Sequence, residues 1–233
     1  MCATPRSGST LLCGLLRSTG VAGRPESYFR RDDLDEYANR WGVLRGADGT
    51  VDASYVQAAV AAGSTPNKVF AARIMWGTMS ELTDALRLAA GSSTASDVEL
   101  LTEAFGPTRF VHLRRGDTLA QAVSWARAEQ THIWHPGEQV APGGQEPHFD
   151  PDLIGRMVET ITAHETAWQA WFTQQGLAPH KVTYEDLAAD PTGVTGDVLK
   201  FLGLGLPPAG TITVGDRRQA DDLNADWIAR FRG

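Results

Sequence analysis

Apolar and polar residues are distributed along the chain in a pattern that alternates between strands and helices. Three apolar runs that favour extended structure predict strands at residues 69–75, 109–113 and 181–184. Segments with helical spacing lie between these runs. Such alternation predicts an α/β fold in which helices flank a parallel sheet.

The clearest helical segment covers residues 151–175. Apolar side chains recur there every three to four positions, at Ile154, Val158, Ile161, Trp168 and Phe172. The segment also carries recognisable end signals. Asp150 can cap its first turn, Pro151 suits the first helical position, and Gly176 can end the helix.

Composition indicates an ordinary globular protein and excludes several classes of partner. The chain has 233 residues, 42% hydrophobic and 21% charged, so we expect residues 1–233 to form a single domain. Its formal net charge of −7 argues against nucleic acid, because a polyanion binder needs a broad basic surface. We expect no transmembrane segment and no signal peptide. Two cysteines, Cys2 and Cys13, are too few for a disulfide framework, which favours a cytoplasmic location.

Residues 4–12, TPRSGSTLL, predict a loop that holds an anion at the start of a helix. Gly8 permits close backbone approach, and successive N–H groups of such a loop can point at one anion beside the positive end of the helix dipole. Its polar side chains are those of Arg6, Ser7, Ser9 and Thr10. A capped helix after a turn would need the same residues, so that alternative stays open. The spacing does not match the G-x-x-x-x-G-K-[ST] loop of ATP-binding proteins.

A second stretch, HLRRGDTLAQAVSWARAEQTHIW at residues 112–134, predicts another anion site. A strand ends there in two arginines and a helix follows. Helical spacing puts Ala120, Ser124, Arg127 and Thr131 on one face of that helix. Arg115 and Ser124 can therefore clamp an anion, although a surface helix with stray charges would give the same pattern. Because ligands of such sheets bind at the carboxyl ends of strands, two clamps of this kind favour one shared binding site.

Together these residues resemble the sulfotransferase family that uses 3′-phosphoadenosine 5′-phosphosulfate (PAPS) as donor. The resemblance rests on the loop PRSGST, on Arg115 and Ser124, and on the sequence YEDL at residues 184–187. Three further blocks are similar to a bacterial branch that sulfates trehalose: residues 19–29 (TGVAGRPESYF), 122–134 (AVSWARAEQTHIW) and 218–231 (RQADDLNADWIARF). The resemblance implies a P-loop NTPase-like sulfotransferase fold, PAPS as the sulfuryl donor, and a homodimer.

By position, the resemblance implies a complete nucleotide site. The residues expected to bind the 5′-phosphosulfate are Arg6, Ser7, Gly8, Ser9 and Thr10. Arg6 is also expected to stabilise the negative charge that develops during transfer, and is therefore a candidate catalytic residue. Arg115 and Ser124 are expected to bind the 3′-phosphate, and Tyr184 to reach the adenine.

Two features depart from the common pattern of the family. Arg115 and Ser124 are nine residues apart, one more than in animal cytosolic members, although the bacterial branch shares this spacing. The G-x-x-G-x-W-K segment near the C-terminus is missing. DRRQAD at residues 216–221 stands in its place, where Arg217 and Arg218 can close over the nucleotide.

The general base is expected at Glu26. Many family members use a histidine, but none of the six histidines here follows the first helix closely, whereas Glu26 does. The corresponding glutamate of the bacterial branch is the proposed base. Contact with Tyr28 and Phe29 would remove solvation from the carboxylate and make it a stronger base. Without the resemblance, an exposed acid beside Arg24 or Arg30 would be the simpler interpretation.

Aromatic residues near these motifs predict a sugar acceptor, since aromatic faces stack on the C–H faces of a sugar while polar groups bind its hydroxyls. The expected acceptor contacts are Tyr28, Phe29, Arg73, Trp76, Arg127 and Trp134. Core packing is the competing interpretation of the tryptophans. No group of residues has the spacing of metal ligands, so no metal is expected.

The predicted function is PAPS-dependent transfer of a sulfuryl group to a hydroxyl of a trehalose-like glycan or glycolipid. A lipid or secondary-metabolite acceptor is the alternative, because the same residue types would bind it. A nucleotide-binding protein without sulfotransfer is a third hypothesis from a different class.

Overall fold

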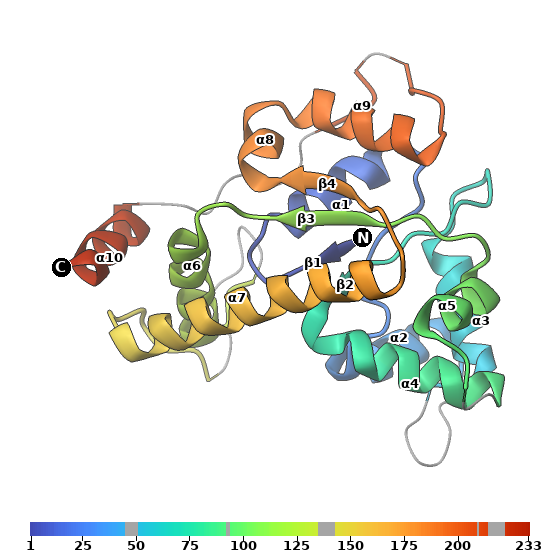
Figure 1. Cartoon of the computed structure of the whole chain (residues 1–233), viewed down its shortest axis with the longest axis horizontal. Helices are drawn as coiled ribbons and strands as arrows, with labels where there is room; N and C mark the ends of the chain where they lie inside the picture. The colour runs from blue at the N-terminus through green and yellow to red at the C-terminus, as the bar shows by residue number, and fades with distance from the viewer. Residues whose placement is uncertain (45–50, 92–93, 135–142, 209, 214–221) are drawn as a thin grey trace.

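A four-stranded parallel sheet lies at the centre of the computed structural model, which describes residues 1–44, 51–91, 94–134, 143–208, 210–213 and 222–233 (Figure 1). The strands are β1 (Cys2–Ala3), β2 (Ile74–Met75), β3 (Val111–Arg114) and β4 (His180–Thr183). Their order is β2-β1-β3-β4, and every neighbouring pair is parallel. The prediction of an α/β fold with a parallel sheet flanked by helices is therefore confirmed.

Helices cover both faces of this sheet. They are α1 (Ser9–Ser18), α2 (Leu34–Trp41), α3 (Ala53–Gly63), α4 (Met79–Ala90), α5 (Asp97–Phe105), α6 (Thr118–Thr131), α7 (Pro151–Gln174), α8 (Tyr184–Ala189), α9 (Pro191–Leu202) and α10 (Asp222–Arg232), with short 3₁₀ turns at Arg31–Asp33 and Trp76–Thr78. In Figure 1, α1, α8 and α9 lie above the sheet and α7 runs below it. Consecutive residues of β3 point to opposite faces of the sheet. Leu113 packs with the leucines of α1, whereas His112 lies against Trp168 of α7.

Local sequence signals explain the long helix α7. Its first turn is capped by the Asp150 carboxylate, which accepts a hydrogen bond from the Leu153 N–H at 2.9 Å, and Pro151 occupies the first helical position. Gly176, just beyond the end, has the positive φ of 63° that glycine adopts without strain. The expected helix at residues 151–175 is confirmed to within one residue.

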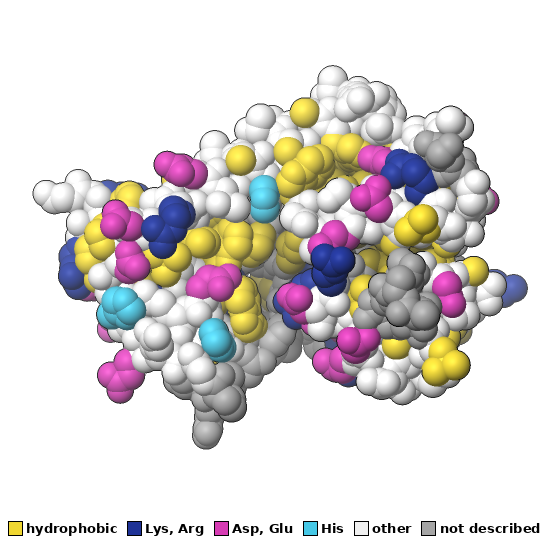
Figure 2. All heavy atoms as spheres, turned by 90° about the horizontal axis from the view of Figure 1, so that it is seen from below, with side chains coloured by type: hydrophobic (Ala, Val, Ile, Leu, Met, Phe, Trp, Pro, Cys, Tyr) yellow, Lys and Arg dark blue, Asp and Glu magenta, His cyan; other side chains and the backbone are white. Residues whose placement is uncertain are grey.

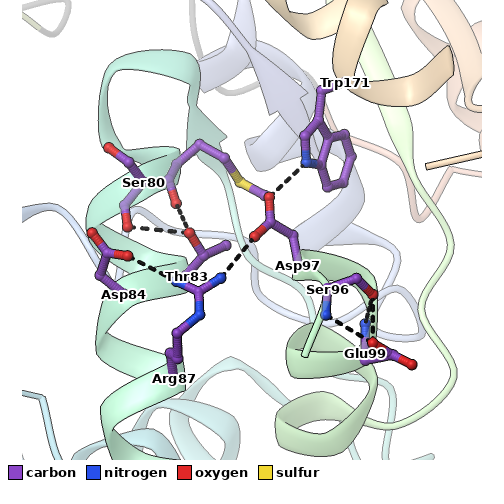
Figure 3. Close-up of polar contacts among 9 residues, drawn as sticks. Ser80, Thr83, Asp84, Arg87, Ser96, Asp97, Glu99 and Trp171 are labelled. Atoms are coloured by element: carbon purple, nitrogen blue, oxygen red, sulfur yellow. Dashed lines mark hydrogen bonds and ion pairs between the residues drawn. The ribbon is translucent and has the colours of Figure 1, made fainter. Parts of the chain in front are cut away.

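A second group of helices, α2 to α5, is joined to α7 through Asp97. The Asp97 carboxylate accepts a hydrogen bond from the Trp171 indole N–H at 2.9 Å and pairs with Arg87 at 3.4 Å (Figure 3). A capping box between Ser96 and Glu99 starts α5 beside this contact. These polar bonds surround an apolar core that includes Trp171, so the two regions share buried surface.

The strand predicted at residues 69–75 is shorter than expected. Only Ile74 and Met75 pair with β1. The preceding residues are extended but bond elsewhere: the Ala71 N–H donates to the Gly63 carbonyl at 3.2 Å, and the Arg73 N–H donates to the Glu26 carbonyl at 2.9 Å. This run therefore ties the segment that carries Glu26 to the edge of the sheet.

Candidate active site

The anion loop lies between β1 and α1, as its sequence predicts. Gly8 is the N-cap of α1 with φ of 91°, and among the described residues no side chain caps the first turn of this helix. Ser7 is fully buried, and its hydroxyl donates to the Thr4 carbonyl at 2.8 Å. The N-cap residue thus gives the first N–H groups of α1 no side-chain acceptor, and such a helix start can bind an anion.

Buried polar contacts hold this loop from below. The Gln121 side-chain amide of α6 is fully buried, and it donates to the Thr4 hydroxyl at 2.8 Å and to the Pro5 carbonyl at 2.6 Å. The Thr4 hydroxyl donates in turn to the Glu165 carboxylate of α7 at 3.1 Å. The loop is therefore fixed to the helices that follow β3 and precede β4.

Arg6 connects the two expected anion pockets directly. Its Nε donates to the Ser124 hydroxyl at 3.0 Å, and another guanidinium nitrogen donates to the Trp134 carbonyl at 2.7 Å. Its backbone is left-handed, with φ of 61°, a conformation that costs a non-glycine residue energy. Ser124, expected at the 3′-phosphate, thus contacts a residue expected at the 5′-phosphosulfate.

Tyr184 lies between the same two pockets. A Cβ added to Gly8 would meet the Tyr184 Cδ2 at 2.6 Å, so the ring packs where only glycine fits. The Arg115 guanidinium lies over the same ring, with its Cζ 4.6 Å from the centroid of the Tyr184 ring. The loop, Arg115 and Tyr184 follow the ends of β1, β3 and β4, which place all three at one edge of the sheet.

Glu26 and Arg73 make a separate set of contacts with α1 and its first turn. The Arg73 guanidinium donates to the Ser27 hydroxyl at 2.9 Å and to the Thr10 hydroxyl at 3.2 Å. The Glu26 carboxylate pairs with Arg17 of α1 and is 36% exposed. One arginine thus bridges the anion loop and the segment of the candidate base.

The surroundings of Glu26 differ from both interpretations of this residue. The alternative of an exposed acid placed it beside Arg24 or Arg30, but its carboxylate pairs with Arg17, and Arg30 pairs with Asp33. The shielding expected from neighbouring aromatic rings is partial, since the carboxylate stays half-exposed. Beneath the pair lies the buried Cys13, where burial raises the pKa of the thiol to about 11 and the charges of Arg73, Glu26 and Arg17 act more weakly.

The structure separates the expected acceptor residues into buried and accessible ones. Tyr28 and Phe29 are only 3% and 6% exposed and pack among the aromatic rings of the α2–α5 region. Burial raises the pKa of the Tyr28 hydroxyl, which donates to a backbone carbonyl. Trp76 and Trp134 are half-buried, and the Trp76 ring also packs edge-on against Trp168 at 5.0 Å between centroids.

Three expected residues lie away from these contacts or outside the described chain. Arg127 follows Ser124 on α6, but its guanidinium donates to the Asn224 side chain of α10 at 2.6 Å. Arg217 and Arg218 lie outside the described residues.

Residues that the sequence interpretation did not single out complete the site. Arg17 holds Glu26, Ser27 binds Arg73, and Gln121 supports the loop. Glu185, beside the expected Tyr184, accepts hydrogen bonds from the backbone after Arg115. Helical spacing offered one signal, because Arg17 comes seven residues after Thr10 and therefore shares its face of α1. The other contacts join segments far apart in the sequence.

The face of the molecule seen from below carries charges of both signs (Figure 2). Lys and Arg side chains are interspersed with Asp and Glu on the described part of the face in Figure 2, and they form no continuous basic patch there. Within the described ranges, no three His, Cys, Asp or Glu residues are grouped to hold a metal ion. No helix in the same ranges combines the length and apolar character needed to cross a bilayer.

Comparison with known proteins agrees with this geometry. The family described as Stf0 sulphotransferase matches residues 1–233. A trehalose 2-sulfotransferase of Mycolicibacterium smegmatis is 30% identical over 254 aligned positions, which cover 99% of this chain and 92% of that protein. A trehalose 2-sulfotransferase of Mycobacterium tuberculosis is 29% identical, with 99% and 92% covered. The family match over the whole chain and these two relatives show that the chain belongs to the Stf0 sulphotransferase family.

Proposed function

We propose that this enzyme transfers a sulfuryl group from PAPS to a hydroxyl of a carbohydrate, either a trehalose-like glycan or a glycolipid. The observation that carries the proposal is the position of Arg73, which bonds to Thr10 in the anion loop and to Ser27 beside Glu26. A donor group at the loop and a base at Glu26 would therefore face the same guanidinium. The names of the trehalose-sulfating relatives support a sugar as acceptor.

The residues at the sheet edge fit the two phosphate groups of such a donor. When bound, PAPS supplies an activated sulfuryl group and a phosphate as the leaving group. The uncapped start of α1, with Gly8, Ser9 and Thr10, offers N–H and hydroxyl donors for the 5′ end. Arg115 and Ser124 offer a cation and a hydroxyl for the 3′ end.

Two arginines would neutralise charge at the loop from different sides. Arg6 belongs to the loop itself and contacts Ser124 of α6, and Arg73 reaches the loop from the run before β2. Well-placed donors that meet developing negative charge are worth about 3 kcal/mol each. Because sulfuryl transfer resembles phosphoryl transfer in needing position and charge stabilisation, this chain requires no covalent nucleophile.

Glu26 is proposed to accept the proton of the acceptor hydroxyl as its oxygen bonds to sulfur. The ion pair with Arg17 orients the carboxylate, and the Glu26 carbonyl is fixed by the Arg73 N–H at 2.9 Å. A base must lie within hydrogen-bond reach of the proton that it removes, so a fixed backbone helps to define where the sugar binds. The half-buried rings of Trp76 and Trp134 are the proposed stacking faces, whereas Tyr28 and Phe29 support the segment from the core.

Calorimetric unfolding with nucleotides tests this proposal. We expect adenosine 3′,5′-bisphosphate to stabilise the chain without metal, by about 2.7 kcal/mol at a concentration of 100 Kd. ATP with Mg²⁺ is expected to do less, because the loop lacks the lysine of ATP-binding loops. Stabilisation by ATP with Mg²⁺ alone would instead support a nucleotide-binding protein without sulfotransfer.

An acceptor panel with radiolabelled PAPS then identifies the substrate class. We expect label in trehalose or a trehalose-containing glycolipid. Label only in a lipid or aromatic hydroxyl would overturn the carbohydrate assignment while leaving the sulfuryl transfer intact. A homodimer and a cytoplasmic location remain predictions from the sequence.

A further inference from the structure

Glu185 binds the backbone immediately after Arg115. Its carboxylate accepts hydrogen bonds from the Gly116 N–H at 3.0 and 3.2 Å and from the Asp117 N–H at 3.4 Å. Glu185 is the second residue of α8, and residues 116–117 form the turn that leads from β3 into α6. Two turns at the same sheet edge, 68 to 69 residues apart in sequence, are thus joined by one charged side chain.

The neighbouring residue makes the complementary contacts. Tyr184 packs on Gly8 of the anion loop, and the Arg115 guanidinium lies 4.6 Å from the centroid of its ring. Tyr184 therefore fixes the Arg115 side chain, while Glu185 fixes the Arg115 backbone from its C-terminal side. The dipeptide at the start of α8 holds both ends of one arginine, and it also contacts the loop where the other phosphate group is proposed to bind.

We propose that Glu185 is a positioning residue for the 3′-phosphate pocket, a proposal that rests on the nucleotide specificity proposed above. The carboxylate occupies the two N–H groups of the turn, so it keeps them from binding a phosphate and leaves that task to Arg115 and Ser124. It also fixes the turn from which Arg115 projects. Glu185 itself would not touch the nucleotide, and its removal should therefore weaken recognition of the 3′-phosphate alone.

Titration calorimetry with two nucleotides separates this role from general support of the fold. Adenosine 3′,5′-bisphosphate and 5′-AMP differ in the 3′-phosphate. For Glu185→Ala we expect roughly tenfold weaker binding of the bisphosphate, which is the size of one lost charged hydrogen bond. Binding of 5′-AMP should change by less than about twofold. Glu185→Gln keeps one acceptor oxygen, so its affinity for the bisphosphate should lie between those of the wild-type protein and Glu185→Ala.

Glu103→Ala is the matched control, because Glu103 is an exposed glutamate on α5 and its loss changes the net charge equally. Hydrogen exchange adds a readout that needs no nucleotide: the amides of residues 116–117 should exchange faster in Glu185→Ala than in Glu103→Ala. Equal losses for both nucleotides would reduce Glu185 to a structural role and overturn the proposal. Tighter bisphosphate binding in Glu185→Ala would also overturn it, by showing that the carboxylate competes with phosphate.

Binding of the bisphosphate by the wild-type protein separates a failure of the Glu185 proposal from a failure of the proposed function. Wild-type binding of the bisphosphate together with unchanged binding by Glu185→Ala would reject the role of Glu185 and leave the proposed function standing. Failure of the wild-type protein to bind the bisphosphate would reject both.

Discussion

Glu26 is paired with an arginine from the helix that begins at the anion loop, and both partners are substantially exposed, at 36% for Glu26 and 46% for Arg17. Exposed ion pairs contribute little to folding, typically about 0–1 kcal/mol. The Arg17–Glu26 pair therefore contributes little to the free energy of folding. Its value lies in orientation, because it ties the carboxylate to α1, the helix that also carries Thr10.

Glu26→Gln should separate chemistry from binding and from stability. The amide keeps the shape of the side chain but cannot take a proton, so we expect turnover to fall about 10²- to 10⁴-fold. Nucleotide affinity and the unfolding midpoint should be unchanged. Steady-state rates with PAPS and titration with adenosine 3′,5′-bisphosphate would measure both effects.

Asp33→Asn is the control for this change, because Asp33 is a nearby acid that also pairs with an arginine, Arg30, at 2.5 Å. It should leave turnover essentially unaltered. Full activity in Glu26→Gln would assign the proton transfer to another group.

At the scale of elements, the loop before α1 depends on helices far away in the sequence. Gln121 of α6 and Glu165 of α7 both reach Thr4, and the Trp168 indole N–H of α7 donates to the Ala3 carbonyl at 3.1 Å. These bonds are buried, so each partner would be costly to leave unpaired. The position of the loop consequently depends on the helices that hold it.

Gln121→Leu removes the donor to Thr4 and Pro5 while keeping an apolar side chain in the buried position. We expect a loss of about 1–3 kcal/mol in the free energy of unfolding, because two buried acceptors lose their partner. Bisphosphate affinity should fall as well, since the loop loses its support. Denaturant unfolding and titration calorimetry measure the two losses.

Gln169→Leu supplies the comparison, as Gln169 is an exposed glutamine on α7. It should be near neutral in both measurements. Equal stability of the two variants would show that the Gln121 bonds carry no net energy.

The elements differ in how far the sequence could predict them. The ends of α7 follow from Asp150, Pro151 and Gly176, which act on their own neighbours. The strand at residues 69–75 was predicted too long, because the same extended residues can pair with a sheet or with a loop. Strand pairing is a contact between distant segments, and local preference does not determine it.

In the candidate site, too, the features set by neighbouring residues were predictable and the contacts between distant segments were not. The loop around Gly8 is a continuous stretch, so its form was predictable from residue types alone. The burial of Tyr28 and Phe29 depends on partners such as Tyr37 and Tyr55, which come from other helices. The YEDL sequence marked Glu185 only as part of a motif, because its contact depends on the turn at residues 116–117 lying next to it.

At the scale of the whole molecule, α7 links the sheet to the α2–α5 region. Trp168 is fully buried and donates to Ala3, while Trp171 bonds to Asp97. A core that continues from the sheet into the helical region favours unfolding in one step. The single domain predicted from the sequence can be tested on this basis.

We expect one thermal transition, with the same midpoint by far-ultraviolet circular dichroism and by tryptophan fluorescence. Trp168→Ala should lower that midpoint without splitting the transition, because a buried tryptophan truncated to alanine costs about 3–5 kcal/mol. Two separate transitions in the wild-type protein would show that the α2–α5 region unfolds independently.

The left-handed backbone of Arg6, with φ of 61°, has a consequence for protein engineering. Glycine would relieve a backbone strain of about 1–2 kcal/mol at this position, so Arg6→Gly is a substitution that stability design would consider. The same substitution would detach the loop from Ser124 and Trp134. The proposed role of Arg6 at the donor site would then be lost together with these contacts, so libraries that aim at heat resistance should keep Arg6 constant.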